Sequence, residues 1–433
     1  MSGVPRNVTA RRETLAPTRT SERIQSLDII RAIALFGVLA MHVTVFSGQL
    51  GMRLLDAEGR LPANGIFDQT AFYAIGLFLV GKAYAIFSML FGIGLYLQLE
   101  RAKDKGLNTT LFTVRRLGAL FLIGCIHRIF IWSGDILVTY ALVGTLLPVF
   151  MKFSARTCIL FAVLLLVGVT SFPIWSSLFH LDPGSLSLGQ NTHLLDAADK
   201  AKMATRVMHK EWSPYLIAAA QRASRFRTLL VDELPLILAT LPLFLVGVTI
   251  WKKRIPASPE KFTRFFKVFI AIGTPVGLAV SLFAVNPFHL FPDATLYVFH
   301  GGIWLVARDV AALILGATYF MGLVWLIKIS PTWASRLNVL APMGRMALTN
   351  YLCQSLVLTT IFTKPGFGLY NALSMRLALT VLLINYTVQV VVSKWWLSRF
   401  QFGPVEWIWR SATYWKIQPM RKFVIAEHTD AGA

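Results

Sequence analysis

The chain has 433 residues, of which 55% are hydrophobic and only 15% are charged. This composition is too apolar for an ordinary soluble protein, and several apolar runs are long enough to cross about 30 Å of hydrocarbon. The net charge of +21 comes from basic clusters between the apolar runs. That placement is typical of cytoplasmic loops and argues against a nucleic-acid-binding protein. The three cysteines show neither a disulfide framework nor metal-ligand spacing, so no metal site is expected.

The charge pattern predicts an all-α, polytopic membrane helix bundle with about ten transmembrane helices and both termini in the cytoplasm. Residues 1–25 are expected to form a flexible cytoplasmic tail and residues 26–400 a single transmembrane domain. An outer polar segment at about 180–227 includes an amphipathic helix at 194–211. Residues 401–433 are expected to form a cytoplasmic tail at the membrane interface, because tryptophans alternate there with basic residues.

The expected spans follow the apolar runs in chain order. An interfacial piece at residues 68–80 is expected before the second span, and Arg308 and Asp309 are expected to interrupt the eighth. The spans are residues 29–46, 87–99, 112–132, 136–150, 157–179, 228–250, 266–285, 296–329, 338–362 and 374–397.

The first span carries three ionisable residues, Asp28, Arg31 and His42. Arg31 and His42 are eleven positions apart, which places them within about 20° of the same helix face and about 16 Å apart along the axis. A neutral imidazole is a suitable general base, and a guanidinium binds phosphate or carboxylate. The alternative is an Asp28–Arg31 ion pair at the interface, with His42 bonded to a backbone carbonyl.

A second set, His127, Arg128 and Asp135, lies at the turn after the third span. These residues are candidates for binding an acceptor or for orienting His42. The alternative is a local salt bridge that fixes the helical hairpin.

A third set contains Arg345, Asn350 and Gln354, and Asn350 and Gln354 share one helix face. The two amides either line a cavity or hydrogen-bond to a neighbouring helix. Lys82 is similar, since it either lines a cavity or extends its amine to the interface or to a partner.

Five motifs along the chain resemble the YeiB-like family of bacterial membrane proteins, also called domain of unknown function 418. The resemblance covers about residues 23–410. The motifs are SLDIIRAIALFGVLAMH (26–42), KAYAIFSMLFGIG (82–94), GCIHRIFIWSGDILVTYALVG (124–144), GRMALTNYLCQ (344–354) and FGPVEWIWR (402–410).

The family is similar to transmembrane acyltransferases, which pass acyl groups from a cytosolic donor such as acetyl-CoA to an outer acceptor. The leading hypothesis has His42 as the general base, with Asp28 orienting Arg31 and His127 assisting, and has Arg31, Arg345 and Lys82 binding the donor. Members of that wider group typically separate the Arg and the His of the first span by ten residues, as here. YeiB-like proteins commonly have Asn at the position of His42, so this chain departs from its nearer family.

The resulting hypothesis is an inner-membrane acyltransferase that moves an acyl group from acyl-CoA to a hydroxyl or amine of a sugar or lipid. No tightly bound cofactor is expected, since the thioester is already activated. The alternative is a transporter of a small anionic solute or lipid, because intramembrane charged residues also suit a substrate pathway.

Overall fold

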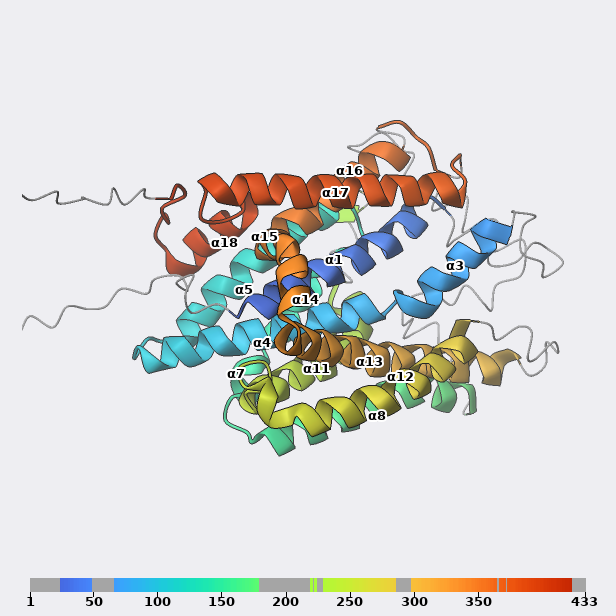
Figure 1. Cartoon of the computed structure of the whole chain (residues 1–433), viewed down its shortest axis with the longest axis horizontal. Coiled ribbons are helices and arrows are strands. Elements are labelled where there is room, and N and C mark those ends of the chain that lie inside the picture. Colours follow the sequence, from blue (N-terminus) through green and yellow to red (C-terminus); the bar gives the residue numbers. More distant parts are fainter. Residues whose placement is uncertain are drawn as a thin grey trace, which may run out of the picture.

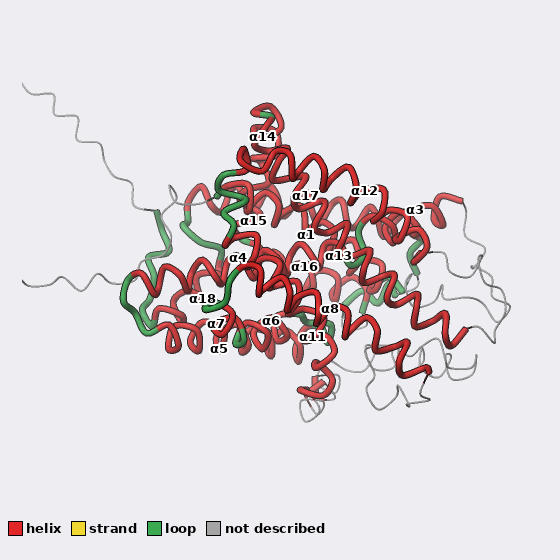
Figure 2. Tube along the Cα trace, turned by 90° about the horizontal axis from the view of Figure 1, so that it is seen from below, coloured by secondary structure: helices red, strands yellow, loops and turns green. Residues whose placement is uncertain are grey.

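The computed structural model describes residues 24–48, 66–178, 219–220, 222–223, 229–285, 297–363, 366–370 and 372–422. This part of the chain contains helices and no strand, apart from an isolated bridge between Phe400 and Arg421 (Figure 2). Six of the described helical stretches are long and apolar enough to cross a membrane. The prediction of an all-α, multi-pass membrane bundle is therefore confirmed, whereas the number of ten spans and the orientation of the termini stay predictions.

Helix α1 (Gln25–Phe46) lies at the centre of the bundle. It packs against α4 (Lys82–Asp104), α13 (Tyr297–Ile329), α15 (Ala341–Arg345), α16 (Ala347–Phe362) and α17 (Met375–Arg399). Figure 1 shows α1 running between α17 on one side and α4 on the other. A helix that is apolar on nearly all faces belongs in the interior, and Ile30, Leu35, Leu39 and Val43 have no measurable exposure.

A second group of helices packs on the far side of α4. It contains α8 (Ala155–Leu178), α11 (Leu229–Lys252) and α12 (Thr263–Val285), which follows the short 3₁₀ helix η5 (Pro259–Phe262) (Figure 1). Helices α4 and α11 approach closely at Gly92 and Gly247, because a Cβ on Gly92 would lie 2.5 Å from the Phe244 carbonyl oxygen. Small residues at such crossings let membrane helices pack backbone to backbone.

Most expected spans agree with helices, but two are broken. The span at 136–150 consists of α6 (Leu137–Gly144) and α7 (Leu147–Phe150), and the proline near the start of α7 explains the break. The span at 338–362 consists of η7 (Asn338–Leu340), α15 and α16, with a non-helical Met346 before α16. The interruption expected at Arg308 and Asp309 is wrong, because α13 continues through them.

The remaining elements complete the two ends of the bundle. The interfacial piece expected at 68–80 corresponds to α3 (Ile66–Phe78), and Gly81, with φ of 78°, separates it from α4. Helix α5 (Thr109–Ile126) continues into a π-helix, η2 (His127–Ile131). Helices α14 (Pro331–Leu337) and α18 (Pro404–Tyr414) follow. Residues 1–23 of the expected tail and the expected helix at 194–211 lie outside the described residues.

Glu406 of α18 caps the N-terminus of α16. Its carboxylate accepts hydrogen bonds from the Leu348 and Thr349 backbone N–H groups at 2.7 and 3.0 Å, and from the Thr349 hydroxyl at 2.5 Å. The first residues of a helix have no acceptors within the helix, and Met346 at the N-cap supplies no side-chain cap. Glu406, 8% exposed, therefore fixes α18 to α16.

Replacing Glu406 with alanine is expected to destabilise the protein by about 2 kcal/mol, the upper range for a lost helix cap. Glu406→Gln is the matched control, because its amide oxygen still accepts both N–H groups and its NH₂ donates to Thr349. The measurement is thermal unfolding of purified protein in detergent. Equal losses in the two variants would contradict the capping role.

The comparison of the wild type with Glu406→Gln also tests a predicted pH dependence of stability. Burial raises the pKa of Glu406 above its ordinary 4.5, although hydrogen bonds from Thr349 and Leu348 act in the opposite direction. A carboxyl with a raised folded-state pKa contributes stability at low pH that is lost as the pH rises through that pKa. The unfolding temperature of the wild type should therefore fall relative to Glu406→Gln as the pH rises above about 4.5.

Candidate functional site

Two residue clusters lie on one face of α1. Arg31 and His42 share this face because α1 is a continuous helix, whereas Ile33 and Gly37 point to the opposite side. One cluster surrounds Arg31 near the start of α1, and the other surrounds His42 near its end. The clusters are about 16 Å apart along the helix axis.

The His42 side chain lies in an aromatic setting. It is 6% exposed, and its ring centroid lies 4.6 Å from Trp132, edge to face, and 5.8 Å from Tyr351. Its Nδ1 atom is buried and has no hydrogen-bond partner among the described residues. The structure therefore shows no bond from this nitrogen to a backbone carbonyl, which was the alternative expected for His42.

His127, the first residue of the π-helix η2, is paired with Asp135. Its Nδ1 is 2.8 Å from Asp135 Oδ1, and Asp135 Oδ2 accepts a hydrogen bond from the Val138 N–H at the start of α6. Gly124 leaves the space for this contact, since a Cβ there would lie 3.0 Å from Asp135 Oδ2. The pair closes the hairpin between η2 and α6, as the local alternative predicted. His127 also lies in a π-helix, and π-helical turns are frequent at functional sites.

The second ring nitrogen of His127 is available to accept a proton. Nε2 is buried and has no partner among the described residues. When Nδ1 carries the proton that Asp135 accepts, Nε2 holds a free lone pair. Asp135 therefore orients His127, and its hydrogen bonds reach His127 and Val138, not His42.

Tyr351 of α16 joins the two histidines. Its ring centroid lies 5.4 Å from that of His127, and its hydroxyl accepts a hydrogen bond from the Ile136 N–H at 3.4 Å. We call His42, His127, Asp135, Trp132 and Tyr351 the imidazole cluster. Tyr351 and Trp132 were not singled out as site residues from the sequence, although both lie inside the quoted motifs.

A basic cluster lies at the other end of α1. Arg31 donates to Asp28 at 2.5 Å, as expected for the ion pair, and its side chain stays 25% exposed. Gly344 brings α15 against α1 here, because a Cβ on Gly344 would lie 1.8 Å from the Asp28 carbonyl oxygen. Arg345 follows directly, and its Nε is buried and unpartnered within the described part of the chain.

Arg410 of α18 belongs to the same basic cluster. Burial lowers the pKa of its guanidinium, while Glu406 and Asp28 act to raise it and Arg345 to lower it. Guanidinium groups stay protonated at neutral pH even so. The basic cluster thus combines Arg31, Arg345 and Arg410 with Asp28, an arrangement suited to a phosphate or carboxylate ligand.

The other predicted site residues lie elsewhere. Lys82 is buried and donates to the Gly76 carbonyl and the Ser281 hydroxyl, so it does not extend to the interface. Asn350 and Gln354 hydrogen-bond across to Ser393 and Gln389 of α17, which matches the interhelical alternative.

Arg128 is half-buried beside His127 and takes part in further contacts. No group of three His, Cys, Asp or Glu side chains within the described ranges is placed to hold a metal ion.

Comparison with known proteins identifies the family. The chain is 30% identical to the uncharacterized protein YxaH of Bacillus subtilis over 425 residues, which cover 94% of this chain and 98% of YxaH. The model for the DUF418 family, proteins of unknown function, matches residues 250–416. The chain belongs to the DUF418 family.

Other relatives extend the similarity over nearly the whole chain. YeiB of Escherichia coli is 27% identical over 421 residues, covering 90% of this chain and 96% of YeiB. An uncharacterized 39.9 kDa protein of Bacillus acidopullulyticus is 25% identical over 405 residues, covering 92% of this chain and 96% of the relative. No solved structure matches significantly. The resemblance to the YeiB-like family is therefore confirmed. The names of these relatives state no activity.

Proposed function

We propose that this DUF418 protein is an acyltransferase of the bacterial inner membrane. It would move an acyl group from a cytosolic acyl-CoA to a hydroxyl or amine of a sugar or lipid acceptor. The observation that carries the proposal is the imidazole cluster, in which the buried His127–Asp135 pair and His42 each keep an unpartnered ring nitrogen. A thioester needs no covalent enzyme intermediate, because proximity and removal of the acceptor proton suffice.

The separation of the clusters favours an extended donor. A single phosphate or a short acyl phosphate cannot contact Arg31 and reach the imidazole cluster about 16 Å away along α1. Coenzyme A carries phosphates at one end of a long flexible arm and its thioester at the other end. The positive-inside pattern supports a position of the basic cluster on the cytoplasmic side, where acyl-CoA is available.

The contacts of Asp135 support His127 as the general base. His127 Nε2 would take the proton from the acceptor while the acceptor oxygen or nitrogen attacks the thioester carbon. The carbon–sulfur bond then breaks, and the proton passes from His127 to the leaving thiolate. His42, across Tyr351, would bind the acceptor. This assignment exchanges the roles expected from the sequence, because Asp135 pairs with His127.

The test is CoA release from acetyl-CoA by the purified protein in lipid vesicles supplied with hexoses, hexosamines and membrane lipids. Chromatographic detection of CoA avoids thiol reagents, which would react with the exposed Cys353. CoA release with acetylation of one acceptor is the expected result. Acetate or substrate uptake into sealed vesicles without CoA release would instead indicate a transporter.

Replacing Arg31 or Arg345 with alanine is expected to raise the KM for acetyl-CoA by about tenfold or more, since a charge-assisted hydrogen bond contributes about 1.5–3 kcal/mol. The kcat should change little, because these side chains would bind the phosphates and not the reacting atoms. Arg308→Ala is the control, as Arg308 is exposed on α13 and pairs with Asp309. An unchanged KM in both cluster variants would remove the basic cluster from the donor site.

A further inference from the structure

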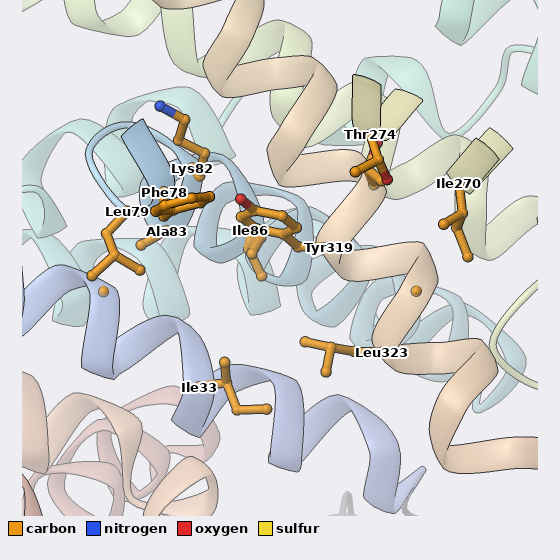
Figure 3. Close-up of a pocket in the computed structure, with 13 residues that line it drawn as sticks. Ile33, Phe78, Leu79, Lys82, Ala83, Ile86, Ile270, Thr274, Tyr319 and Leu323 are labelled. Atoms are coloured by element: carbon orange, nitrogen blue, oxygen red, sulfur yellow. The ribbon is translucent and has the colours of Figure 1, made fainter. Parts of the chain in front are cut away.

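A crevice of about 450 Å³ lies on the opposite face of α1 from the imidazole cluster. It opens between α1, α4, α12 and α13, and Figure 3 shows Ile33 and Leu323 facing it from different helices. Because Ile33 and Gly37 point away from the Arg31–His42 face, this crevice is separate from the proposed acyl-transfer site.

The walls of the crevice are suited to a hydrocarbon chain. Ile33, Leu79, Ile86, Ile270 and Leu323 line it. Glycine leaves room at one wall, since a Cβ on Gly322 would meet no atom closer than 3.8 Å. Apolar surface of this kind attracts apolar ligands without fixing their identity.

Lys82 supplies the polar end. It also lines the crevice, and in Figure 3 it lies at the end away from Leu323, with its amine directed away from Ile33 and Leu323. Its amine is buried and donates to the Gly76 carbonyl oxygen at 3.0 Å and the Ser281 hydroxyl at 2.7 Å. No carboxylate within the described ranges pairs with it. An ammonium has three N–H donors, and these two bonds use two of them.

The burial of Lys82 restricts the anion. The residue is 4% exposed, and its amine bonds to Ser281, about one helical turn before the end of α12. A phosphodiester is permanently charged and is costly to bring to such a buried position. A carboxylic acid enters in its neutral form and can then form a hydrogen-bonded pair with the amine.

We propose that this crevice binds a long-chain fatty acid, with its alkyl chain along Ile33, Ile86 and Leu323 and its carboxyl group at Lys82. The ligand belongs to a site separate from acyl transfer and does not depend on that activity. A fatty acid has one alkyl chain for the crevice and one carboxyl group for Lys82.

The experiment uses the full-length protein in nanodiscs of zwitterionic phosphatidylcholine and a palmitic acid that carries a photoreactive diazirine on its chain. Crosslinked peptides are identified by mass spectrometry. We expect labelling concentrated on α1, α4 and α13, with displacement by unlabelled palmitate. Uniform labelling over the apolar surface, or equal displacement by phosphatidylglycerol, would overturn the proposal.

Two variants with matched controls test the two ends of the crevice. Gly322→Leu fills the space and Lys82→Met removes the amine while keeping the chain length. Each is expected to reduce palmitate binding about tenfold, equivalent to about 1.4 kcal/mol.

The controls are Gly168→Leu, on an exposed and open part of α8, and Lys252→Met, whose amine binds carbonyls near α7. Both should bind as the wild type does. If Gly322→Leu binds normally the chain lies elsewhere, and if Lys82→Met binds normally the carboxyl contact is wrong. Size-exclusion profiles and unfolding temperatures show whether each variant is folded.

Discussion

Replacing His127 with alanine is expected to lower kcat for acyl transfer by about 10²–10⁴-fold, the usual contribution of a general base. His127 is the imidazole whose tautomer is fixed by a buried carboxylate, through the 2.8 Å contact to Asp135. Asp135→Asn keeps the size of the side chain but removes the charge that stabilises a protonated imidazole. It should therefore lower kcat in the same direction. Steady-state CoA release by purified variants measures both effects.

Removing only the hydroxyl of Tyr351 is a smaller change to the imidazole cluster than removing a histidine. Tyr351→Phe keeps the ring between His42 and His127 and removes only the oxygen bonded to the Ile136 N–H. Tyr140→Phe is the matched control, because Tyr140 is also buried in a helix but bonds to Ser88. Packing should survive in both variants, so unfolding temperatures show whether an activity loss is chemical.

The outcomes for the two histidines separate the possible roles. A large loss of kcat in His127→Ala with a raised acceptor KM in His42→Ala supports His127 as base. If His42→Ala loses kcat and His127→Ala does not, the base is His42, as the sequence comparison implied. If wild-type protein releases no CoA under any acceptor condition, the acyltransferase proposal itself fails.

The sequence predicted the parts of the site that depend on helical periodicity. The face shared by Arg31 and His42 follows from spacing within one helix, and the Asp28–Arg31 pair follows from residues one turn apart. The pairing of His127 with Asp135 spans a single turn of the chain. These contacts are local, so the printed sequence already contains them.

The remaining features depend on distant residues. Tyr351 meets Ile136 across 215 positions, and Glu406 caps a helix that begins 59 positions earlier at Ala347. Periodicity cannot show which distant helices meet, so the sequence suggested a continuous span at 338–362 and an interfacial tail from residue 401. The non-helical Met346 between α15 and α16 became visible only in the structure, where it lets α15 pack against α1.

Replacing Gly344 with valine is expected to prevent α15 from packing on α1 and to destabilise the protein by about 3 kcal/mol or more, beyond the usual range for overpacking. Even a single Cβ at this position would lie 1.8 Å from the Asp28 carbonyl oxygen and 3.2 Å from the Ala32 nitrogen. Both atoms belong to the backbone of a buried helix, so neither can rotate away as a flexible side chain would.

The matched control for Gly344 is Gly118→Ala in α5, where a Cβ meets no atom within 4 Å. Alanine in a helix interior is favoured over glycine by about 0.5–1 kcal/mol, so Gly118→Ala should be neutral or stabilising. Thermal unfolding in detergent compares it with Gly344→Ala and Gly344→Val. A Gly344→Val protein with wild-type stability would contradict the close approach of α15 to α1.

A milder variant at Gly344 connects the packing to the proposed donor site. In Gly344→Ala, α15 must move away from Asp28, and Arg345 moves with it because the two residues are adjacent. The KM for acetyl-CoA should therefore rise in protein that remains folded, while kcat stays close to that of the wild type. If Gly344→Ala instead loses kcat at an unchanged KM, the arginines at this end of α1 act on the chemical step and not on donor binding.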